Sequence, residues 1–495
     1  MLTRDSPYAH HLAQNIILIL LSLIFLPLDT FVVAVSYGLQ FLFPTQATAS
    51  SPQSRKTILV TGVSMSKGLV IARLFAQSGH RVIGADFSPY ACGRVSRSLS
   101  AFYRVPAPTP SDSSPYISAL LSVVKKERVD LWVSCSGVAS AVDDGEAKEA
   151  LERAGCMAVQ FGVRDTSILH EKDSFMNRTQ ELGLIIPETK RVASTQEAEE
   201  FLVREKEEAE RKFIMKCVGL DDASRADMTL LPRATIEETQ KHLQKLKISE
   251  RNPFIIQEFI SGPEFCTHAL VIKGHVEAFV TCPSAELLMH YVALPEDSAL
   301  NRAMLNFTRR YAEASGESFT GHLSFDFLVK KEDISRQEDE IRLYPIECNP
   351  RAHTAVVLFN QTPKMVEAYM KALEPPSVKW RGSNTNGEME KVPIYPVNPQ
   401  KYYWVGHDLG ELVILPLLRL CQGQVPLNQV VVKFQTFLGH LFLWHDGTYE
   451  IWDPLPWWWL YHVFWPMKFI DSLMTGRRWS RINVSTTKMF GVDSN

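Results

Sequence analysis

Three side chains with oxygen ligands are spaced so that they could bind one divalent cation. Glu347 and Asn349 stand two residues apart in a strand-like segment, so their side chains share one face of the strand. Asp326 lies in an earlier segment, residues 321–329, in which apolar and polar residues alternate. Carboxylate and amide oxygens suit Mg²⁺, so we predict a magnesium site at Asp326, Glu347 and Asn349.

This site requires the two segments to pair as an antiparallel hairpin. The charged stretch between them, residues 330–340, reads as a turn whose position would bring Asp326 opposite Glu347. Pro345 in the second strand predicts a sheet edge or a bulge there. The competing interpretation is a surface hairpin with incidental acids, because exposed acids are common.

Cationic side chains accompany the two acids and the amide along the chain. Arg351 follows directly after the second strand, where its planar guanidinium could hold a phosphate or a developing anion. Lys216 ends the apolar run of residues 213–216, and a lysine there needs a partner such as a phosphate. Lys172 stands at a predicted helix start. For either lysine alone, a solvated or ion-paired role is the commoner one.

Residues 254–264 read as an apolar strand, an acid, a glycine turn and a second acid. Backbone groups near Glu258 and Ile260 could contact an adenine edge, and Glu264 could accept hydrogen bonds from ribose hydroxyls.

The elements upstream predict an open α/β sheet that would support these residues. Strands are expected at residues 56–62, 80–84 and 129–134, with a helix at 68–78 after the first strand. The first turn is Gly62-x5-Gly68, which lacks the G-x-G-x-x-G pattern. Asp86 stands where a ribose-binding acid would lie, so an NAD enzyme is an alternative interpretation of this region alone.

Composition narrows the class of protein. The chain has 495 residues, 45% of them hydrophobic, and a formal net charge of -3, which argues against a general nucleic-acid binder. Its eight cysteines are scattered without a C-x-x-C pair, so we expect buried, reduced thiols and a reducing compartment.

The N-terminal stretch predicts a membrane anchor. Between residues 15 and 43 the only charged residue is Asp29, and this apolar run exceeds the length of a signal-peptide core. Two arrangements remain open: one tilted span, or a hairpin turning at Pro27. Residues 44–55 read as a linker.

The aromatic-rich segment of residues 452–465 allows two interpretations. Because Trp and Tyr favour the membrane interface, this segment could rest on the bilayer beside the anchor. Alternatively, it packs inside a small helical domain.

Taken in order, these motifs resemble the ATP-grasp superfamily. The order is lysine, lysine, Q-E-F-x-x-G-x-E, D-F and E-x-N-P-R, between about residues 56 and 370. Further segments resemble the mycosporine-glycine synthase family. They are the turn with Thr61, Gly62, Met65 and Lys67, and residues 103–108, 264–268, 346–353 and 453–456.

The resemblance implies a role for each matching residue. Lys172 and Lys216 would hold ATP phosphates, Glu258 and Ile260 would contact adenine, and Glu264 would contact ribose. Asp326, Glu347 and Asn349 would bind Mg²⁺, with Mn²⁺ as an alternative metal, and Arg351 would be the catalytic cation. Tentative substrate contacts are Arg225, His268 and His353, each with a structural role as its alternative.

Two departures from the superfamily pattern stand out. The loop after Lys216 has only Gly219 rather than a glycine-rich run, and Ser324 replaces an arginine two residues before the first metal acid.

The implied function is an ATP- and magnesium-dependent ligase that joins an amino acid such as glycine to a phosphate-activated acceptor, releasing ADP and phosphate. The resemblance implies 4-deoxygadusol as acceptor and mycosporine-glycine as product. A ligase for another acid and an anchored nucleotide-binding scaffold are the alternatives. The expected partners are these small molecules and membrane lipid, not nucleic acid, with the catalytic body facing the cytosol.

We predict an α/β chain of four parts. They are a membrane anchor with linker (1–55), a Rossmann-like domain (56–165), an ATP-grasp α+β domain (166–375) and a helical, aromatic-rich C-terminal segment (376–495).

Overall fold

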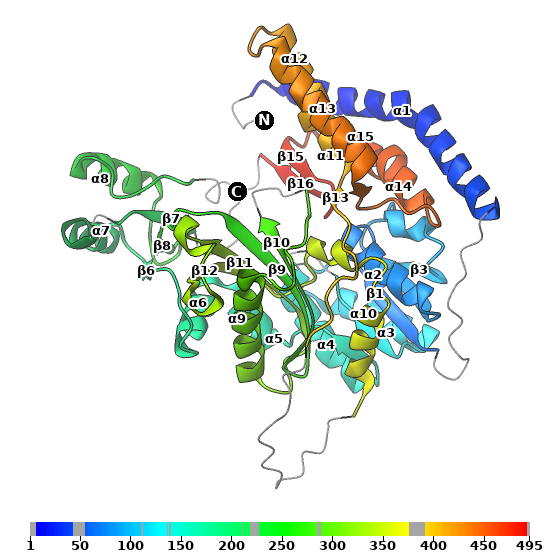
Figure 1. Cartoon of the computed structure of the whole chain (residues 1–495), viewed down its shortest axis with the longest axis horizontal. Helices are drawn as coiled ribbons and strands as arrows, with labels where there is room; N and C mark the ends of the chain where they lie inside the picture. The colour runs from blue at the N-terminus through cyan, green and yellow to red at the C-terminus, as the bar shows by residue number, and fades with distance from the viewer. Residues whose placement is uncertain are drawn as a thin grey trace.

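The structure is a computed structural model with a mixed α/β body and a long N-terminal helix on its surface (Figure 1). It describes residues 6–42, 55–109, 112–135, 137, 140–209, 211–217, 227–284, 289–375 and 392–492, without the side chains of 205–209. The prediction of an α/β fold is confirmed. The four predicted part boundaries stay predictions.

The first part of the body is a five-stranded parallel sheet. Its strand order is β3-β2-β1-β4-β5, with β1 in the centre. The strands are β1 (Thr57–Thr61), β2 (Arg81–Asp86), β3 (Ala101–Arg104), β4 (Leu131–Val133) and β5 (Met157–Val159). The three strands predicted here are present, with ends shifted by up to two residues.

Helices on both faces explain why these strands are apolar without alternation. Ile58 and Val60 of β1 pack into one core cluster with α2 (Ser66–Gln77), whereas Leu59 packs into a second cluster. That second cluster includes residues of α3 (Ser114–Glu127) and α4 (Ala141–Arg153). A parallel sheet buried on both faces needs apolar residues at every position.

A four-stranded antiparallel sheet carries the acidic motif. Its order is β10-β9-β11-β12. The strands are β9 (Glu264–Ile272), β10 (His275–Ser284), β11 (Gly321–Val329) and β12 (Leu343–Asn349). Leu323, Phe325 and Phe327 of β11 form a buried cluster with helix α9 (Ala299–Ser315) and with α5 (Val163–His170) and α6 (Lys172–Glu181). The alternation in residues 321–329 therefore reflects one face turned to these helices.

A smaller sheet lies beside it and includes the Lys216 strand. Its antiparallel order is β6-β8-β7, with β6 (Thr189–Val192), β8 (Phe254–Glu258) and β7 (Phe213–Cys217). Helices α7 (Thr195–Ala209) and α8 (Ile236–Lys245) pack on it through Phe201, Leu202 and Leu243.

The C-terminal part is largely helical. Its helices are α11 (Val405–Asp408), η9 (Leu409–Ile414), α12 (Leu415–Cys421), α13 (Leu427–Leu443), α14 (Leu455–Trp459), η10 (Leu460–Phe464) and α15 (Trp465–Thr475). Two short strand pairs join them: β13 (Tyr402–Tyr403) with β14 (His445–Asp446), and β15 (Trp479–Asn483) with β16 (Lys488–Gly491). The remaining short helices are η2 (Cys92–Val95), η5 (Lys331–Asp333), η6 (Glu338–Glu340), η7 (Thr354–Phe359), α10 (Lys364–Met370) and η8 (Lys371–Leu373).

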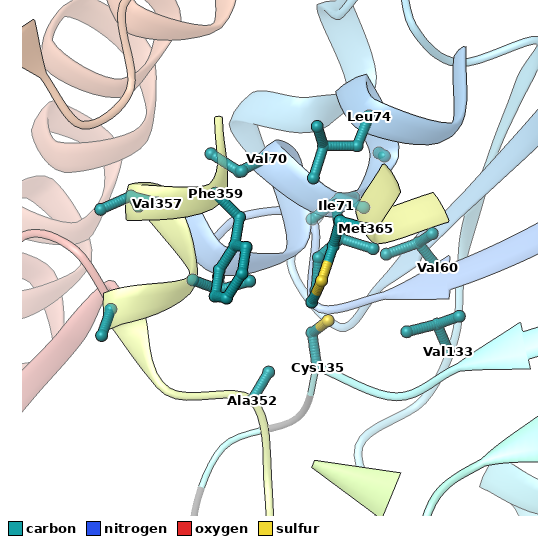
Figure 2. Packing of buried hydrophobic residues seen from close by; sticks show 14 of the residues in the cluster. Val60, Val70, Ile71, Leu74, Val133, Cys135, Ala352, Val357, Phe359 and Met365 are labelled. Carbon is teal, nitrogen blue, oxygen red and sulfur yellow. The ribbon is translucent and has the colours of Figure 1, made fainter. Parts of the chain in front are cut away.

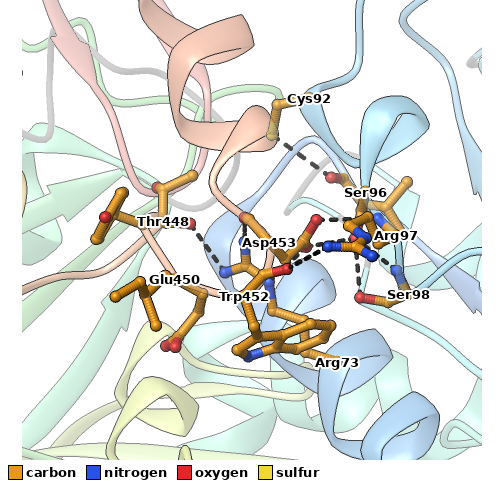
Figure 3. A network of polar contacts seen from close by, with 12 residues as sticks. Arg73, Cys92, Ser96, Arg97, Ser98, Thr448, Glu450, Trp452 and Asp453 are labelled. Carbon is orange, nitrogen blue, oxygen red and sulfur yellow. Dashed lines mark hydrogen bonds and ion pairs between the residues drawn. The ribbon is translucent and has the colours of Figure 1, made fainter. Parts of the chain in front are cut away.

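A buried ion pair fastens the C-terminal part to the parallel sheet (Figure 3). The Arg73 Nε of α2 donates to Asp453 Oδ2 at 2.9 Å, and its Nη1 donates to the Thr448 carbonyl at 2.8 Å. Ser96 Oγ and the Arg97 backbone amide also donate to the Asp453 carboxylate, at 2.6 and 2.9 Å. Because this buried charge pair is fully hydrogen-bonded, removal of one partner would strand the other.

Helix α1 (Tyr8–Leu42) is a single helix that continues through Pro27. The hairpin arrangement with a turn at Pro27 is therefore wrong. Among the described residues, α1 is the one helix long and apolar enough to cross a bilayer.

A polar stripe on α1 contacts the C-terminal part at seven-residue intervals. Trp479 Nε1 donates to Asn15 Oδ1 at 3.0 Å, and Ser22 Oγ donates to the Tyr461 carbonyl at 2.9 Å. Further along, Asp29 and Ser36 bond His462 Nε2 and Tyr449 Oη, at 2.8 and 2.7 Å. A spacing of seven residues is close to two helical turns, so all four side chains share one face. The opposite face is apolar and largely exposed.

The aromatic-rich C-terminal segment packs mainly inward. Trp457 and Trp465 are buried, and the rings of Trp465 and Trp479 each stack on Phe469. Trp458 donates from Nε1 to Thr30 of α1 at 3.0 Å. These contacts favour the packing interpretation of this segment over a bilayer-facing patch.

Candidate active site

The acidic motif forms a hairpin, as its spacing predicted. Strands β11 and β12 pair antiparallel with Asp326 opposite Glu347 and Ser324 opposite Asn349. The register shifts between Asp326 and Phe327, next to Pro345, so a bulge occurs where a proline removes a ladder donor. Strand β12 is also an edge strand, which confirms both structural consequences expected of Pro345.

The pairing brings three side-chain groups together. Asn349 Nδ2 donates to Asp326 Oδ2 at 2.9 Å and to Glu347 Oε1 at 3.3 Å. The orientation of an amide is an assignment, and a cation in this place would turn its oxygen toward the two carboxylates. All three sites predicted to bind metal therefore lie within contact of one another.

Two carboxyl groups this close do not ionise independently. Burial and the neighbouring Glu347 raise the pKa of Asp326 well above its usual range. Burial alone would raise the pKa of Glu347 too, but the hydrogen bond with Asp326 and the charges of Lys172, Lys216 and Arg351 lower it. Repulsion between the two carboxylates disfavours their simultaneous ionisation, and a divalent cation between them would relieve it. This donor set of hard oxygens fits Mg²⁺.

Around these acids lies a cavity of about 1140 Å³, called here the hairpin cavity. Its lining includes Lys172, Lys216, Glu258, Ile260, Glu264, Asp326 and Glu347. Seven of the residues predicted to bind nucleotide or metal thus converge on one cavity, although they come from separate strands and helices.

The surroundings of Lys216 in the hairpin cavity act on its pKa in opposite directions. Its Nζ donates to Gln257 Oε1 on the adjacent strand at 2.6 Å. Burial and the charge of Lys172 lower its pKa to about 8, while Glu347, Glu264 and Asp326 act to raise it. In such a site the two lysines can bind a polyphosphate, and the acids opposite them can bind its metal ion.

The turn after β8 follows the cavity wall closely. A Cβ on Gly262 would lie 1.9 Å from the carbonyl oxygen of Val329, so only glycine fits there. Next to it, Glu264 accepts a hydrogen bond from Ser284 Oγ at 2.8 Å. The backbone contact between this turn and the end of β11 holds Glu258 and Glu264 beside the hairpin cavity.

A second cavity lies at the carboxyl ends of the parallel strands and has a volume of about 1080 Å³. We call it the sheet-edge cavity. It is lined by Thr61 and Gly62 of the first βα turn, by Lys67, Asp86 and Arg351, and by residues of the β15–β16 hairpin. Ligands of open α/β sheets bind in this position.

Asp86 does not stand free to bind a ribose. Its carboxylate accepts hydrogen bonds from the backbone amides of Ser64 and Ser88, at 2.8 and 2.9 Å. The acid therefore ties the first βα turn to the end of β2, and this geometry disfavours the NAD interpretation.

Lys67 connects the sheet-edge cavity to the acidic motif. It is buried in the first turn of α2, and its Nζ donates to the Ala352 carbonyl at 2.9 Å. Burial, followed by the charge of Arg351, lowers its pKa to about 7. This lysine belongs to the family motif Thr61, Gly62, Met65 and Lys67, from which no role was predicted for it. Its position six residues after the end of β1, at the start of the following helix, was the available signal.

The segment that carries Arg351 is anchored in the core. Ala352, Val357 and Phe359 pack with Val70, Ile71 and Leu74 of α2 and with Cys135 (Figure 2). Glu347 lines the hairpin cavity, and Arg351 lines the sheet-edge cavity. One rigid segment of five residues thus reaches from the acid cluster to the second cavity.

The two histidines predicted as substrate contacts lie in neither cavity lining. His268 is buried, stacks on His322, and accepts a hydrogen bond at Nδ1 from the His353 backbone amide at 3.3 Å. His353 lies near Asp326 and Cys266, with donor atoms within 4.8 Å of one another. These contacts favour a structural role for the two histidines beside the acidic motif over direct contact with a substrate. Arg225, the third candidate, is outside the described residues.

Arg481 of β15 is a lining residue of the hairpin cavity that no sequence pattern indicated. Asn483 and Lys488 of the same β15–β16 hairpin line the sheet-edge cavity. The C-terminal hairpin therefore contributes to both cavities.

No protein-family model and no curated protein matches the sequence. Solved structures that resemble the chain include an L-amino acid ligase from Bacillus licheniformis, at 15% identity and a TM-score of 0.45, covering 67% of this chain and 75% of that one. An N5-carboxyaminoimidazole synthetase from Staphylococcus aureus has 12% identity and a TM-score of 0.46, and the match covers 65% of this chain and 78% of that one. A phosphoribosylamine–glycine ligase from Thermotoga maritima has 16% identity and a TM-score of 0.45, and the match covers 70% of this chain and 78% of that one. Because these TM-scores are below 0.5, function is inferred below from the site's own residues.

Proposed function

We propose that this chain is an ATP-grasp ligase that uses ATP to activate an acidic acceptor and then joins it to an amine. The observation that carries the proposal is the segment from Glu347 to Arg351. It joins the acid cluster of the hairpin cavity to the Arg351 guanidinium, which lines the sheet-edge cavity. Phosphoryl transfer needs such an arrangement, with charge neutralised on the donor side and the acceptor oxygen held in line.

In this mechanism the hairpin cavity holds ATP. Lys172 and Lys216 bind its phosphates, and Glu258, Ile260 and Glu264 lie where the adenosine would be placed. Asp326, Glu347 and Asn349 would hold Mg²⁺, which supplies charge neutralisation for the transferred phosphoryl group.

The sheet-edge cavity holds the acceptor. An oxygen of its carboxylate, or of a vinylogous enol, attacks the γ-phosphorus, and the bond to ADP breaks. Arg351 stabilises the charge on the transferred group, and protonated Lys67 attracts the acidic acceptor. The amine nitrogen then attacks the activated carbon, the C–O bond to phosphate breaks, and the amine proton is lost.

By family resemblance, the acceptor is 4-deoxygadusol, the amine is glycine and the product is mycosporine-glycine. A ligase for a different acid is the second candidate, because pocket residues of the sheet-edge cavity set the acceptor. The described lining combines Lys67 and Arg351 with apolar side chains such as Met65 and Phe464, which suits a compact acid.

The decisive experiment measures ADP release by the purified full-length protein in detergent. We expect continuous ADP release with 4-deoxygadusol and glycine together, no more than about one equivalent of ADP per enzyme with 4-deoxygadusol alone, and none with glycine alone. ADP with other acid–amine pairs only would support the second candidate. Binding of ATP without ADP release for any pair would leave the anchored scaffold as the interpretation.

We also propose that the chain is attached to a membrane, with its catalytic body in the ATP-containing cytosol. The supporting surfaces are the apolar outer face of α1 and the α12–α13 hairpin, where Leu417, Leu418, Val432 and Phe434 are exposed. Apolar surface of this extent on two separate elements suits lipid contact.

The contacts of α1 favour an orientation along the membrane surface. Asn15 and Ser36, both bonded to the body, are separated by 21 residues, or about 32 Å of helix. That length is close to the ~30 Å hydrocarbon core, so the body accompanies α1 over a full bilayer thickness. An epitope at the N-terminus should therefore be cleaved by protease on the same side of intact membranes as the catalytic body. Protection of that epitope would indicate a spanning helix.

A further inference from the structure

A cluster of two histidines and one aspartate lies outside both cavities. It consists of His290, in the loop between β10 and α9, Asp408 at the end of α11, and His440 in the last turn of α13. His290 Nε2 lies 2.9 Å from Asp408 Oδ1, and His440 Nδ1 lies 2.6 Å from Asp408 Oδ2. The three donor atoms all lie within 4.8 Å of one another.

The carboxylate at the centre of this cluster is fully buried. Asp408 is 0% exposed, while the His290 and His440 side chains are 34% and 15% exposed. Within the described part of the chain, the ion pairs of Asp408 are those with the two imidazoles. A buried carboxylate needs a compensating positive charge, and a neutral imidazole supplies only a hydrogen bond.

The rings around the cluster hold the two imidazoles in place. Trp444 lies against both, with ring centroids 5.6 Å from His290 and 4.5 Å from His440. Tyr403 packs on His440 at 6.0 Å, and His407 packs on His290 at 6.2 Å. An aromatic wall on one side and partial exposure on the other leave room for a water molecule as an additional ligand.

We propose that His290, Asp408 and His440 bind one divalent transition-metal ion of the Zn²⁺ type. Metal–ligand bonds of about 2.0–2.2 Å at angles of 90–110° place ligand atoms roughly 3.0–3.5 Å apart. The two imidazole–carboxylate separations of 2.9 and 2.6 Å would widen slightly to reach this range, and the two imidazole nitrogens already lie within 4.8 Å of each other. Two imidazoles and one carboxylate suit Zn²⁺, Co²⁺ or Ni²⁺, whereas Mg²⁺ prefers the all-oxygen set at Asp326, Glu347 and Asn349.

The ion would clamp the α12–α13 hairpin to the body. The three ligands come from segments 118 and 32 residues apart, and α13 otherwise presents exposed apolar residues along much of its length. Because metal ligation contributes to folding free energy, loss of the ion would loosen α13 without altering the acid cluster of the active site.

The test uses the full-length protein in detergent, stripped with a chelator and dialysed against Zn²⁺ or Co²⁺. Elemental analysis should find one equivalent of metal, and bound Co²⁺ should show the visible absorption of a nitrogen–oxygen site. The double variant His290→Gln/His440→Gln should lose that equivalent, as should Asp408→Asn.

Two controls separate this site from other sources of binding. His445→Gln changes an exposed histidine next to the cluster and should retain the metal. Glu347→Gln alters the proposed magnesium site and should retain it as well. Zn²⁺ should raise the melting temperature of the stripped wild type but not that of the double variant.

Equal metal content in wild type and the double variant, after both have been stripped and reloaded, would overturn the proposal and leave a hydrogen-bonded triad. If the double variant does not fold, the stripped wild type decides alone. It must take up one equivalent of Co²⁺ and gain thermal stability, and failure to do so also overturns the proposal.

Discussion

Lys216 and Lys67, one in each cavity, lie in opposite electrostatic surroundings. Lys216 faces Glu347, Glu264 and Asp326, whose charges act against the effect of burial. Lys67 faces Arg351, whose charge adds to the effect of burial. The pKa values of about 8 and about 7 follow this difference.

The difference teaches how the two cavities divide their tasks. In the hairpin cavity, acids and lysines are balanced, so the cavity can take a metal ion together with a polyphosphate. In the sheet-edge cavity, Lys67 and Arg351 are close enough for the charge of Arg351 to lower the pKa of Lys67, and an anionic ligand would relieve their repulsion.

Glu347→Gln should remove the negative charge of the hairpin cavity and lower the rate of ADP release by about 10³-fold, because a metal-binding carboxylate is lost. Circular dichroism and melting temperature should stay close to wild type. Glu332→Gln, at an exposed acid in the same hairpin, is the matched control and should release ADP at nearly the wild-type rate. Full activity of Glu347→Gln would refute the metal assignment.

Arg351→Lys keeps a positive charge in the sheet-edge cavity but loses the planar guanidinium, which can donate two parallel hydrogen bonds. We expect a fall in kcat of about 10²-fold, with a smaller change in the KM for ATP. Steady-state kinetics measures both. Arg342→Lys, at an exposed position just before β12, should behave as wild type. An effect confined to the KM for ATP would place Arg351 with the nucleotide instead.

Lys67→Met should change how stability depends on pH. The pKa of Lys67 is lowered from 10.5 to about 7, so between these values the unfolded chain holds a proton that the folded chain has lost. Stability therefore rises with pH through this window, and the contribution is constant below it. Urea unfolding at pH 7, 8 and 9 should show a smaller rise for Lys67→Met than for wild type.

The control for this prediction is Lys125→Met, at an exposed lysine of α3, which should keep the wild-type slope. An acidic acceptor should also bind the wild type less tightly as pH rises above 7, because Lys67 loses its proton. An unchanged slope in Lys67→Met would show that the lysine is solvated rather than buried.

Gly262→Ala should have the smallest effect. Its Cβ would collide with the Val329 carbonyl, so the turn must shift, at a cost of about 2 kcal/mol in unfolding free energy. The KM for ATP should rise because Glu258 and Glu264 move with the turn. Gly439→Ala adds a methyl group where no atom lies within 4 Å and is the control. Identical stability of the two variants would contradict this tight contact.

Much of the hairpin cavity was predictable from sequence because its geometry is local. Side chains two apart on a strand share a face, so Glu347 and Asn349 had to lie together. The length of the charged turn limited which residue of β11 could face Glu347, and Asp326 does so. The apolar alternation of β11 likewise predicted the face that packs on α9.

The direction and environment of α1 were less predictable. Its apolar length indicated a membrane anchor, but two arrangements fitted the sequence equally well. The structure shows one continuous helix whose polar stripe meets the C-terminal part. Only the position of the partners, more than 400 residues away, makes the seven-residue spacing meaningful.

The sequence by itself determined the α/β pattern, the acid cluster and the motif order, because strand period and turn length act over short distances. The tertiary structure alone decided which charges meet across the fold. Lys67 reaches the Ala352 carbonyl 285 residues away, and Asp408 meets His290 and His440. Such contacts depend on how whole sheets and helices pack, and no local spacing records that packing.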